Sequence, residues 1–260
     1  MVLHQLKHYV LHRLKSIHLH GIHSPFVFAL NRECLQDQSH YAAYDKIVRF
    51  RESVNNHPQQ LQIEDHGAGS KRLHDDIRTS RDILKNNCSS FKRTKLLYRL
   101  AYHLKAKRVL ELGTSLGIGT HALALAADQV TSIEGSREVW KFAKEKLQET
   151  DFQNIELILG TFSDFFDGEL ALKPSGTYDL IFMDGHHDGN ATLEYFENLL
   201  PYCHSNTVIV VDDIHWSSGM TKAWKKLTSH PQVTASINTF QWGLLFLRKE
   251  QFQQAFYVKL

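Results

Sequence analysis

Near the middle of the chain stands Val109-Leu110-Glu111-Leu112-Gly113-Thr114-Ser115-Leu116-Gly117-Ile118-Gly119, a short apolar strand followed by a glycine turn and the start of a helix. Gly113 and Gly117 allow the backbone to pass close to a ligand, because glycine has no side chain beyond hydrogen. The first turn of the helix offers unpaired N–H groups. Open α/β sheets bind ligands beyond the carboxyl ends of their strands. The sequence therefore predicts a ligand site at this turn.

Outward from the turn, apolar strands alternate with helices from residue 91 onward, which predicts a mostly parallel sheet covered on both faces. The expected strands are 108–112, 130–134, 155–159, 180–184 and 207–212, with an antiparallel hairpin of 233–240 and 243–247 closing the sheet edge. The expected helices include 121–127, 139–147 and 193–200. The predicted fold class is therefore α/β, with a doubly wound, seven-stranded Rossmann-like sheet.

The residues before 91 predict a mainly helical extension. Apolar residues recur there at the spacing of an amphipathic helix: Leu3, Leu6, Val10, Leu14 and Ile17. Three histidines lie four residues apart on another side: His4, His8 and His12. We interpret them as a solvated polar face, although the spacing could also bind a metal. A basic amphipathic helix can rest on a membrane surface or a partner, but a packing stripe explains the same leucines. We predict an extension or lid over 1–90 and a second domain over 91–260.

A second glycine-containing stretch, His66-Gly67-Ala68-Gly69-Ser70, follows a strand-like run at 61–65. The residues after it, 71–76, are too charged for a helix that packs on a central sheet. We therefore predict an ordered surface loop or lid here and not a second ligand site.

The glycines and acids around the turn distinguish two classes of ligand. A dinucleotide site has the pattern G-x-G-x-x-G, whereas this turn reads G-x-x-x-G-x-G and has Glu111 before its first glycine. That acid would repel a pyrophosphate and attract an ammonium or sulfonium. Glu134 ends the next strand, about 20 residues beyond the turn, where an acid can accept both hydroxyls of a ribose. The third strand runs into Thr161, Phe162 and Ser163, an apolar ring beside hydroxyls that suits an adenine.

Taken together, these motifs resemble class I S-adenosylmethionine-dependent methyltransferases. Residues 91–248 are similar to the catechol and caffeoyl-coenzyme A O-methyltransferases and to the sugar O-methyltransferases of macrolide and aminocoumarin biosynthesis. The resemblance implies S-adenosylmethionine as cofactor, with a ribose contact at Glu134 and adenine contacts at Thr161 to Ser163. It implies contacts with the methionine moiety at Glu111, Gly113, Thr114, Ser115 and Gly117.

Acids also stand at the ends of the fourth and fifth expected strands, where Asp184 follows one strand and Asp212 and Asp213 follow the other. Neighbouring parallel strands end at the same crevice, so the three could converge on Mg²⁺ or another hard cation. In the similar O-methyltransferases, one Asp and an Asp-Asp or Asp-Asn pair hold such a metal. Two metal-free alternatives stay open. Asp212 and Asp213 could cap the following helix, and Asp184 could contact the cofactor.

Methyl transfer to a hydroxyl needs a group that takes the proton. His187 lies three residues after Asp184, where the similar catechol enzymes have a basic residue with that role. Histidine titrates near neutral pH and suits the task, so His187 and Asp184 are the expected catalytic pair. His186 and His215 compete for the role, and any of these histidines could instead only bind loop backbone.

Composition narrows the class of acceptor and partner. The 260 residues are 42% apolar and carry a net charge of +2, which gives no global attraction to nucleic acid. The three cysteines form no CxxC pair, which fits a reducing cytoplasm. We expect a small-molecule acceptor and a cytoplasmic location. We expect neither nucleic-acid binding nor stable membrane insertion, and a homodimer is an open option. The alternatives are a metal-independent methyltransferase acting on nitrogen or on a macromolecule, and a nucleotide-binding Rossmann-like protein.

Overall fold

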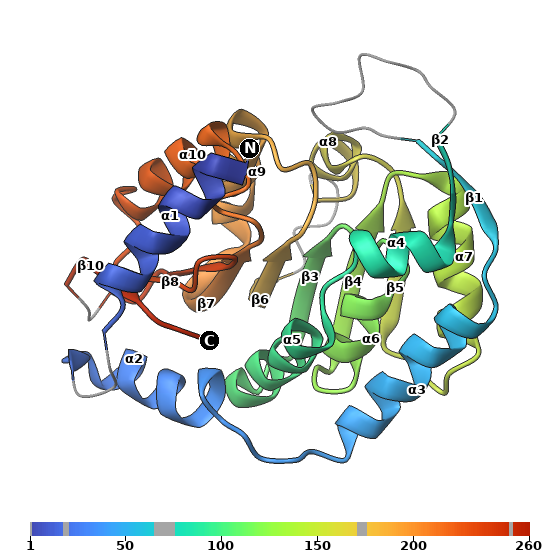
Figure 1. Cartoon of the computed structure of the whole chain (residues 1–260), viewed down its shortest axis with the longest axis horizontal. Coiled ribbons are helices and arrows are strands. Elements are labelled where there is room, and N and C mark those ends of the chain that lie inside the picture. Colours follow the sequence, from blue (N-terminus) through green and yellow to red (C-terminus); the bar gives the residue numbers. More distant parts are fainter. Residues whose placement is uncertain (1, 18–20, 65–75, 171–175, 250–251) are drawn as a thin grey trace. The chain divides into compact units, whose positions relative to one another are not determined.

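The computed structural model describes residues 2–17, 21–64, 76–170, 176–249 and 252–260, whose helices and strands are labelled in Figure 1. The chain divides into two compact units. Unit 1 contains Met1–Asp37 and Ser175–Leu260, and unit 2 contains Gln38–Pro174. Unit 2 therefore holds the glycine turn, whereas unit 1 combines the start of the chain with its last third.

Unit 2 is built around three parallel strands: β3 (Arg108–Leu112), β4 (Gln129–Glu134) and β5 (Ile155–Leu159). They are the first three strands that the sequence predicts. Four of the five residues of β3 are buried, as in parallel strands that are covered on both faces. The helices of this unit are α3 (Ala43–Asn56), α4 (Ser80–Asn86), α5 (Phe91–Leu104), α6 (Ile118–Ala124), α7 (Arg137–Gln148) and α8 (Phe162–Phe165), which continues into the π-helical turn η3 (Phe166–Leu170).

The core of unit 2 follows from the amphipathic pattern of its helices. In α7 the buried residues Val139, Phe142, Ala143 and Leu147 recur at intervals of three and four, so one face of the helix meets the core. Helices α3 and α5 both pack against α6. The hydroxyl of Ser90 caps α5 by accepting a hydrogen bond from the backbone of Arg93 at 3.4 Å. Capping fixes where the helix before the central strand begins.

A two-stranded antiparallel hairpin, β1 (Gln60–Ile63) and β2 (Asp76–Thr79), packs on α7. The backbone N–H of Gln62 donates to Glu138 Oε2 at 2.5 Å. β1 matches the strand-like run in the sequence, whereas β2 was not expected because its surroundings are charged. The predicted loop or lid, including His66 to Ser70, lies at 65–75 and outside the described residues.

Unit 1 contains five strands in the order β10-β8-β9-β7-β6. Their bounds are β6 (Tyr178–Met183), β7 (Cys203–Val211), β8 (Ala235–Asn238), β9 (Gly243–Phe246) and β10 (Gln254–Tyr257). β6 and β7 are parallel, and the predicted β8–β9 hairpin is antiparallel. β10 pairs with β8 in parallel, so one more strand lies beyond the hairpin. The predicted fold class, an α/β protein with mostly parallel strands, is confirmed.

The helices of unit 1 come from both parts of the chain. They are α1 (Val2–Lys15), α2 (Pro25–Leu30), the π-helical turn η2 (Asn31–Leu35), α9 (Gly189–Leu199), the 3-10 turn η4 (Leu200–Tyr202) and α10 (Ser218–Thr228). None of the helices in the described part of the chain is long and apolar enough to cross a lipid bilayer.

The side of α1 that faces the protein is the opposite of the one we expected. His12 is buried, and its Nε2 lies 3.1 Å from the carbonyl oxygen of Asn238 in β8. His4 Nε2 lies 3.0 Å from Thr221 Oγ1 in α10. The prediction of a solvated histidine face is therefore wrong, because these rings find polar partners in unit 1. The leucine stripe is exposed instead: Leu3, Leu6, Val10 and Leu14.

Candidate functional site

The predicted glycine turn follows β3 and has a backbone conformation that glycine adopts easily. The φ angle is 107° at Gly113 and 78° at Gly117, and both values lie in the left-handed range that other residues rarely adopt. The N–H groups of Gly113 and Thr114 both donate to the carbonyl of Ile133 in β4, at 3.0 and 3.1 Å. These bonds fix the turn at the carboxyl ends of β3 and β4, as the sequence predicts.

Glu111 lies beneath this turn and is 1% exposed. Its Oε2 accepts hydrogen bonds from Thr120 Oγ1 at 2.5 Å and from Ser132 Oγ at 2.7 Å. Burial raises the pKa of the Glu111 carboxyl to about 7, against the opposing effect of the two hydroxyl donors. A Cβ atom at Gly119 would lie 2.3 Å from Glu111 Oε1, so the carboxylate needs glycine at this point of α6. The structure thus places Glu111 in the interior, and its contact with a cofactor stays a prediction.

Glu134 ends β4 and faces the turn. Its Oε2 accepts a hydrogen bond from the backbone of Ser115 at 2.8 Å, and its Oε1 accepts one from the backbone of Ser136 at 2.9 Å. The residue is half-buried. A carboxylate has about four lone-pair sites, so one such group can accept several hydrogen bonds at once. This arrangement suits the role that the sequence predicts.

The loop after β5 lies beside Glu134, because the backbone N–H of Gly160 donates to the Glu134 carbonyl at 3.0 Å. Thr161 and Asp164 form a reciprocal cap at the start of α8, in which the Thr161 hydroxyl donates to Asp164 Oδ2 at 2.6 Å. Phe162 is half-buried, and Ser163 is exposed. The Thr161 hydroxyl therefore has an internal partner, which leaves Phe162 and Ser163 as the more accessible side chains of this loop.

Sequence reasoning missed the hydroxyl groups that hold the turn. Thr114 is 2% exposed, and its Oγ1 lies 2.6 Å from Ser132 Oγ. A ligand would therefore meet the backbone of Thr114 and not its side chain. The Ser115 Oγ lies 3.6 Å from Cys88 Sγ, which brings the end of the first 90 residues to the turn. Ser132 lies opposite Glu111 in the β3–β4 register, which the sequence alone does not give.

The turn after β6, in unit 1, holds the predicted base in an uncommon backbone conformation. The N–H of His187 donates to the carbonyl of Gly185 at 2.9 Å, across His186, whose φ is 69°. A hydrogen bond of this span over a residue with positive φ has the form of a γ-turn, which is rare and strained. His187 itself has a φ of 37°. Strained backbone of this kind is concentrated at functional sites.

The three competing histidines have different surroundings. His186 Nδ1 lies 2.6 Å from the hydroxyl of Tyr195. His215 is buried between Thr221 and Asn238, with both of its ring nitrogens 3.1 Å from a polar atom. Burial, aided by nearby histidines, lowers the pKa of His215 to about 3. The His187 ring is half-buried and forms no hydrogen bond with any described residue. It is therefore the histidine whose ring nitrogens are available.

The aspartates after β6 and β7 do not form a ready metal site. Asp212 is 5% exposed, and its Oδ1 accepts a hydrogen bond from the backbone of Asp213 at 2.7 Å. Asp213 has a φ of 49°, and Asp184 is half-buried directly after β6. Among the residues that the structure describes, no group of three or more His, Cys, Asp or Glu side chains is arranged to hold a metal ion. The donor set therefore does not fit Mg²⁺ as it stands.

The capping alternative for these aspartates is wrong. Helix α10 begins at Ser218 and is capped by Ser217, whose Oγ accepts a hydrogen bond from the backbone of Met220 at 3.1 Å. Asp212 and Asp213 lie too far before this helix to satisfy its first N–H groups. The nearby Asp188 does cap a helix, since its Oδ1 accepts from the backbones of Asn190 and Ala191 at the start of α9.

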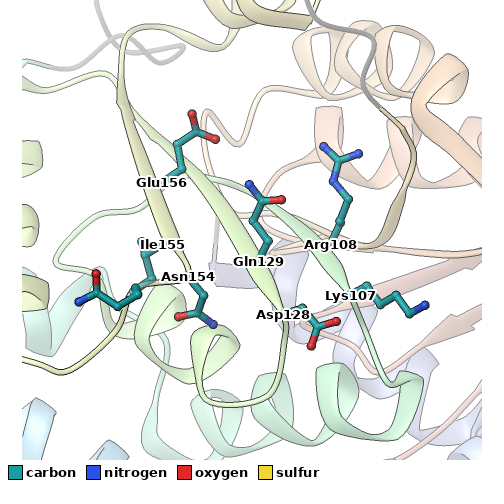
Figure 2. A pocket seen from close by; sticks show the side chains of 8 residues that line it. Lys107, Arg108, Asp128, Gln129, Asn154, Ile155 and Glu156 are labelled. Carbon is teal, nitrogen blue, oxygen red and sulfur yellow. The ribbon is translucent and has the colours of Figure 1, made fainter.

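Unit 2 also has a pocket of about 640 Å³ at the amino ends of β3, β4 and β5, away from the glycine turn. Figure 2 shows the side chains that line this pocket. Arg108, Gln129 and Glu156 extend from the starts of β3, β4 and β5. Ligands of open α/β sheets bind at the carboxyl ends of the strands. We therefore do not assign this cavity to the candidate site.

Comparison with known sequences supports a methyltransferase domain. Residues 110–214 match a family model described as a methyltransferase domain. Catechol O-methyltransferase domain-containing protein 1 of Mus musculus is 33% identical over 125 residues, which are 46% of this chain and 47% of the mouse protein. Protein-L-isoaspartate O-methyltransferase of Methylibium petroleiphilum is 36% identical over 72 residues, 28% of this chain and 24% of that enzyme. The chain thus spans less than half the length of each of these two curated relatives.

Solved structures extend the likeness to the fold. The O-methyltransferase TomG of Streptomyces achromogenes, solved with S-adenosylmethionine, has a TM-score of 0.57 and 20% identity and aligns over 81% of this chain and 91% of TomG. The Bacillus cereus O-methyltransferase, in complex with S-adenosylhomocysteine, has a TM-score of 0.56 and 16% identity over 84% and 94% of the two chains. Residues 110–214 therefore match a methyltransferase-domain model, and the fold of the chain is similar to that of solved O-methyltransferases.

Proposed function

We propose that this chain transfers a methyl group from S-adenosylmethionine to a hydroxyl oxygen of a small molecule. The observation that carries the proposal is the Glu134 carboxylate at the end of β4, tied to the glycine turn through the N–H of Ser115. Such an acid at the second strand end of an α/β sheet suits the hydroxyls of a ribose. The match of residues 110–214 to a methyltransferase domain supports the same cofactor.

The cofactor, when bound, supplies a methyl group on a positively charged sulfur. We propose that Glu134 accepts its ribose hydroxyls and that Phe162, with Thr161 and Ser163, meets the adenine. The proposed methionine contacts are Glu111, Gly113, Thr114, Ser115 and Gly117, and Asp184 is a further proposed contact with the cofactor. Because Thr114 is buried, its part is a backbone contact. The positive φ angles of Gly113 and Gly117 give the turn a backbone conformation that glycine adopts most easily.

His187 is the proposed base. The acceptor hydroxyl must lose its proton as its oxygen bonds to the methyl carbon, while the bonding pair of the carbon–sulfur bond goes to sulfur. A ring nitrogen of His187 takes that proton, and Asp184 is the proposed partner residue at the same strand end. Most of the acceleration in such a displacement comes from positioning and deprotonation of the nucleophile. No step of this scheme requires a metal, and the Mg²⁺ site at Asp184, Asp212 and Asp213 is a separate proposal that the donor arrangement does not favour.

For the methyl acceptor we propose a chemical class, a small molecule with a hydroxyl group. Residues 1–90 are the proposed extension or lid that shapes its site, and the contact between Cys88 and Ser115 in unit 2 is in keeping with that role. We infer this class of acceptor and a cytoplasmic location from the composition and the resemblance, and a homodimer is an open option. The competing proposal is a methyltransferase that acts on nitrogen or on a macromolecule.

Cofactor binding gives the decisive test. Titration calorimetry should show that S-adenosylmethionine and S-adenosylhomocysteine bind and that NAD does not. Glu134→Gln should weaken binding of S-adenosylhomocysteine by about 1–3 kcal/mol, because the ribose hydroxyls lose a charged acceptor. Glu145→Gln, an exposed substitution on α7, is the matched control and should bind like the wild type. Binding of NAD without any response to S-adenosylhomocysteine would overturn the proposal in favour of a nucleotide-binding Rossmann-like protein.

A further inference from the structure

The first helix turns its histidines toward unit 1. The His8 ring stacks on the His215 ring, with centroids 4.7 Å apart and an interplanar angle of 13°. The contacts of His4 with Thr221 and of His12 with Asn238 lie one turn to either side of this stack. Three contacts at successive turns fix the rotation of α1 about its own axis. Its opposite face therefore cannot turn inward while the helix stays packed.

That opposite face is apolar and exposed. Leu3 is 82% exposed, Leu14 is 78% exposed and Leu6 is 56% exposed. With Val10, these residues recur at intervals of three and four, so they form one continuous stripe along the helix. Single exposed apolar residues are common on protein surfaces, but a contiguous apolar patch marks an interaction site.

Basic side chains border the stripe on both sides. At 100° per residue, Arg13 falls on one edge of the stripe and Lys7 on the other, and both are exposed. Residues 1–32 contain no acidic side chain. A short helix with an apolar stripe flanked by basic side chains is typical of helices that lie in the plane of a lipid surface.

We propose that α1 binds the surface of an anionic lipid bilayer, with the stripe Leu3, Leu6, Val10 and Leu14 at the headgroup boundary and Lys7 and Arg13 on the lipid phosphates. A second copy of the chain suits this face less well. A symmetric contact of α1 with itself would place the basic side chains of both copies along one seam, and residues 1–32 have no acid to offset them. An anionic bilayer supplies both the apolar boundary and the opposite charge.

The binding is weak and reversible, because one helix of 14 residues offers only a few apolar side chains. Attraction between lysine or arginine and anionic lipid contributes comparably and falls off within a Debye length. The association therefore depends on salt and on the fraction of anionic lipid. It does not depend on the methyltransferase activity, so the two proposals succeed or fail separately.

Co-sedimentation of the full chain with vesicles tests the proposal. The chain should bind vesicles of phosphatidylcholine with phosphatidylglycerol, and it should not bind vesicles of phosphatidylcholine alone. Leu6→Glu with Val10→Glu should lower the vesicle-bound fraction about tenfold, and Lys7→Gln with Arg13→Gln should do the same at low salt. Phe252→Glu is the matched control, since Phe252 is 88% exposed but lies outside α1. It should bind like the wild type.

Circular dichroism and light scattering complete the experiment. The substituted side chains are exposed, so the variants should keep the helix content of the wild type. Failure to bind anionic vesicles, or equal binding by the Leu6→Glu, Val10→Glu variant, would rule out the lipid surface. A dimer of the wild type that this variant converts to a monomer would assign the stripe to a second copy and would also overturn the proposal.

Discussion

Glu111 and Glu134 belong to neighbouring strands, yet their surroundings give them different chemistry. Glu111 is enclosed, and burial raises the pKa of its carboxyl to about 7, which favours the neutral form. Glu134 is half-buried and accepts hydrogen bonds from the backbone N–H groups of Ser115 and Ser136. Glu111 therefore attracts a sulfonium less strongly than its place in the sequence suggests, and Glu134 is the more accessible acid at the turn.

Replacing Glu111 with glutamine should change how stability depends on pH. Its folded pKa of about 7 lies above the usual 4.5, so the folded chain binds this proton more tightly than the unfolded chain does. The resulting stabilisation is full below pH 4.5 and is lost as the pH rises through about 7. Relative to the wild type, Glu111→Gln should gain on the order of 3 kcal/mol in free energy of unfolding between pH 4.5 and 8. Urea denaturation at several pH values measures this.

The control for that experiment is Glu145→Gln, which replaces an exposed carboxylate on α7. Its unfolding free energy should run parallel to that of the wild type across the same pH range. Parallel curves for Glu111→Gln as well would mean that the Glu111 carboxyl titrates normally and is not desolvated.

Sequence reasoning identified the residues around the turn better than it identified their contacts. Gly113, Gly117 and Glu134 could be predicted, because glycine spacing and an acid at a strand end are local patterns. The enclosure of Glu111 could not, since it depends on Ser132 across the strand pair and on Thr120 in the next helix. Likewise, Asp212 and Asp213 precede a helix in the sequence, but a turn closed by the Trp216 N–H on the Asp213 carbonyl intervenes, and Ser217 caps the helix.

Activity in the presence of a chelator distinguishes a metal site at Asp184, Asp212 and Asp213 from metal-free methyl transfer. Because the described residues do not gather Asp184, Asp212 and Asp213 into a metal site, methyl transfer should persist in excess EDTA once an acceptor is known. Asp213→Asn should likewise leave turnover insensitive to added Mg²⁺. Activity that disappears with EDTA and returns with Mg²⁺ or Mn²⁺, but not in Asp213→Asn, would instead establish the metal that the sequence pattern predicts.

Among the elements, helix α1 shows which features the spacing of apolar residues predicts and which it does not. The spacing of its leucines correctly predicts an amphipathic helix over Val2–Lys15. It does not say which face meets the protein, because that depends on partners more than 200 residues away in the sequence. Thr221 and Asn238 supply hydrogen-bonding atoms for the histidines, and this polar surface selects the polar face of the helix.

The histidine contacts of α1 should make the chain less stable in mild acid. Burial lowers the pKa of His215, His12 and His8, so the unfolded chain binds these protons more readily. Their stabilisation is full above pH 6.5 and is lost as the pH falls below it. Lys225 and the other histidines of the cluster act in the same direction. Between pH 7.5 and 5, His215 alone should account for about 1–2 kcal/mol of unfolding free energy.

Thermal unfolding at a series of pH values measures this loss. His215→Asn should lower the melting temperature at neutral pH but flatten its fall toward pH 5. His57→Gln, which replaces an exposed histidine of α3's end, should leave the slope unchanged. If the melting temperature of His215→Asn fell toward pH 5 as steeply as that of the wild type, burial would not hinder protonation of these histidines in the folded chain.

For the molecule as a whole, the alternation of strands and helices predicts the fold class and five of the sheet strands with close bounds. It does not predict the grouping of the chain. Compactness joins Met1–Asp37 to Ser175–Leu260, whereas the change of pattern along the sequence falls near residue 91. The grouping depends on contacts such as the one between the N–H of Ile17 and the carbonyl of Tyr257, at 3.0 Å. No local pattern records a contact of that separation.

The discontinuity of unit 1 has a consequence for synthesis on the ribosome. α1 is translated before its partners in α10 and β8, which come more than 200 residues later, a delay of roughly 10 s or more at the usual elongation rates. Unit 2 is contiguous and can fold in the meantime, since domains fold as units during translation. The nascent chain therefore carries α1 with both faces unpaired, and for that interval the helix is available to a chaperone or to a lipid surface before its own domain exists.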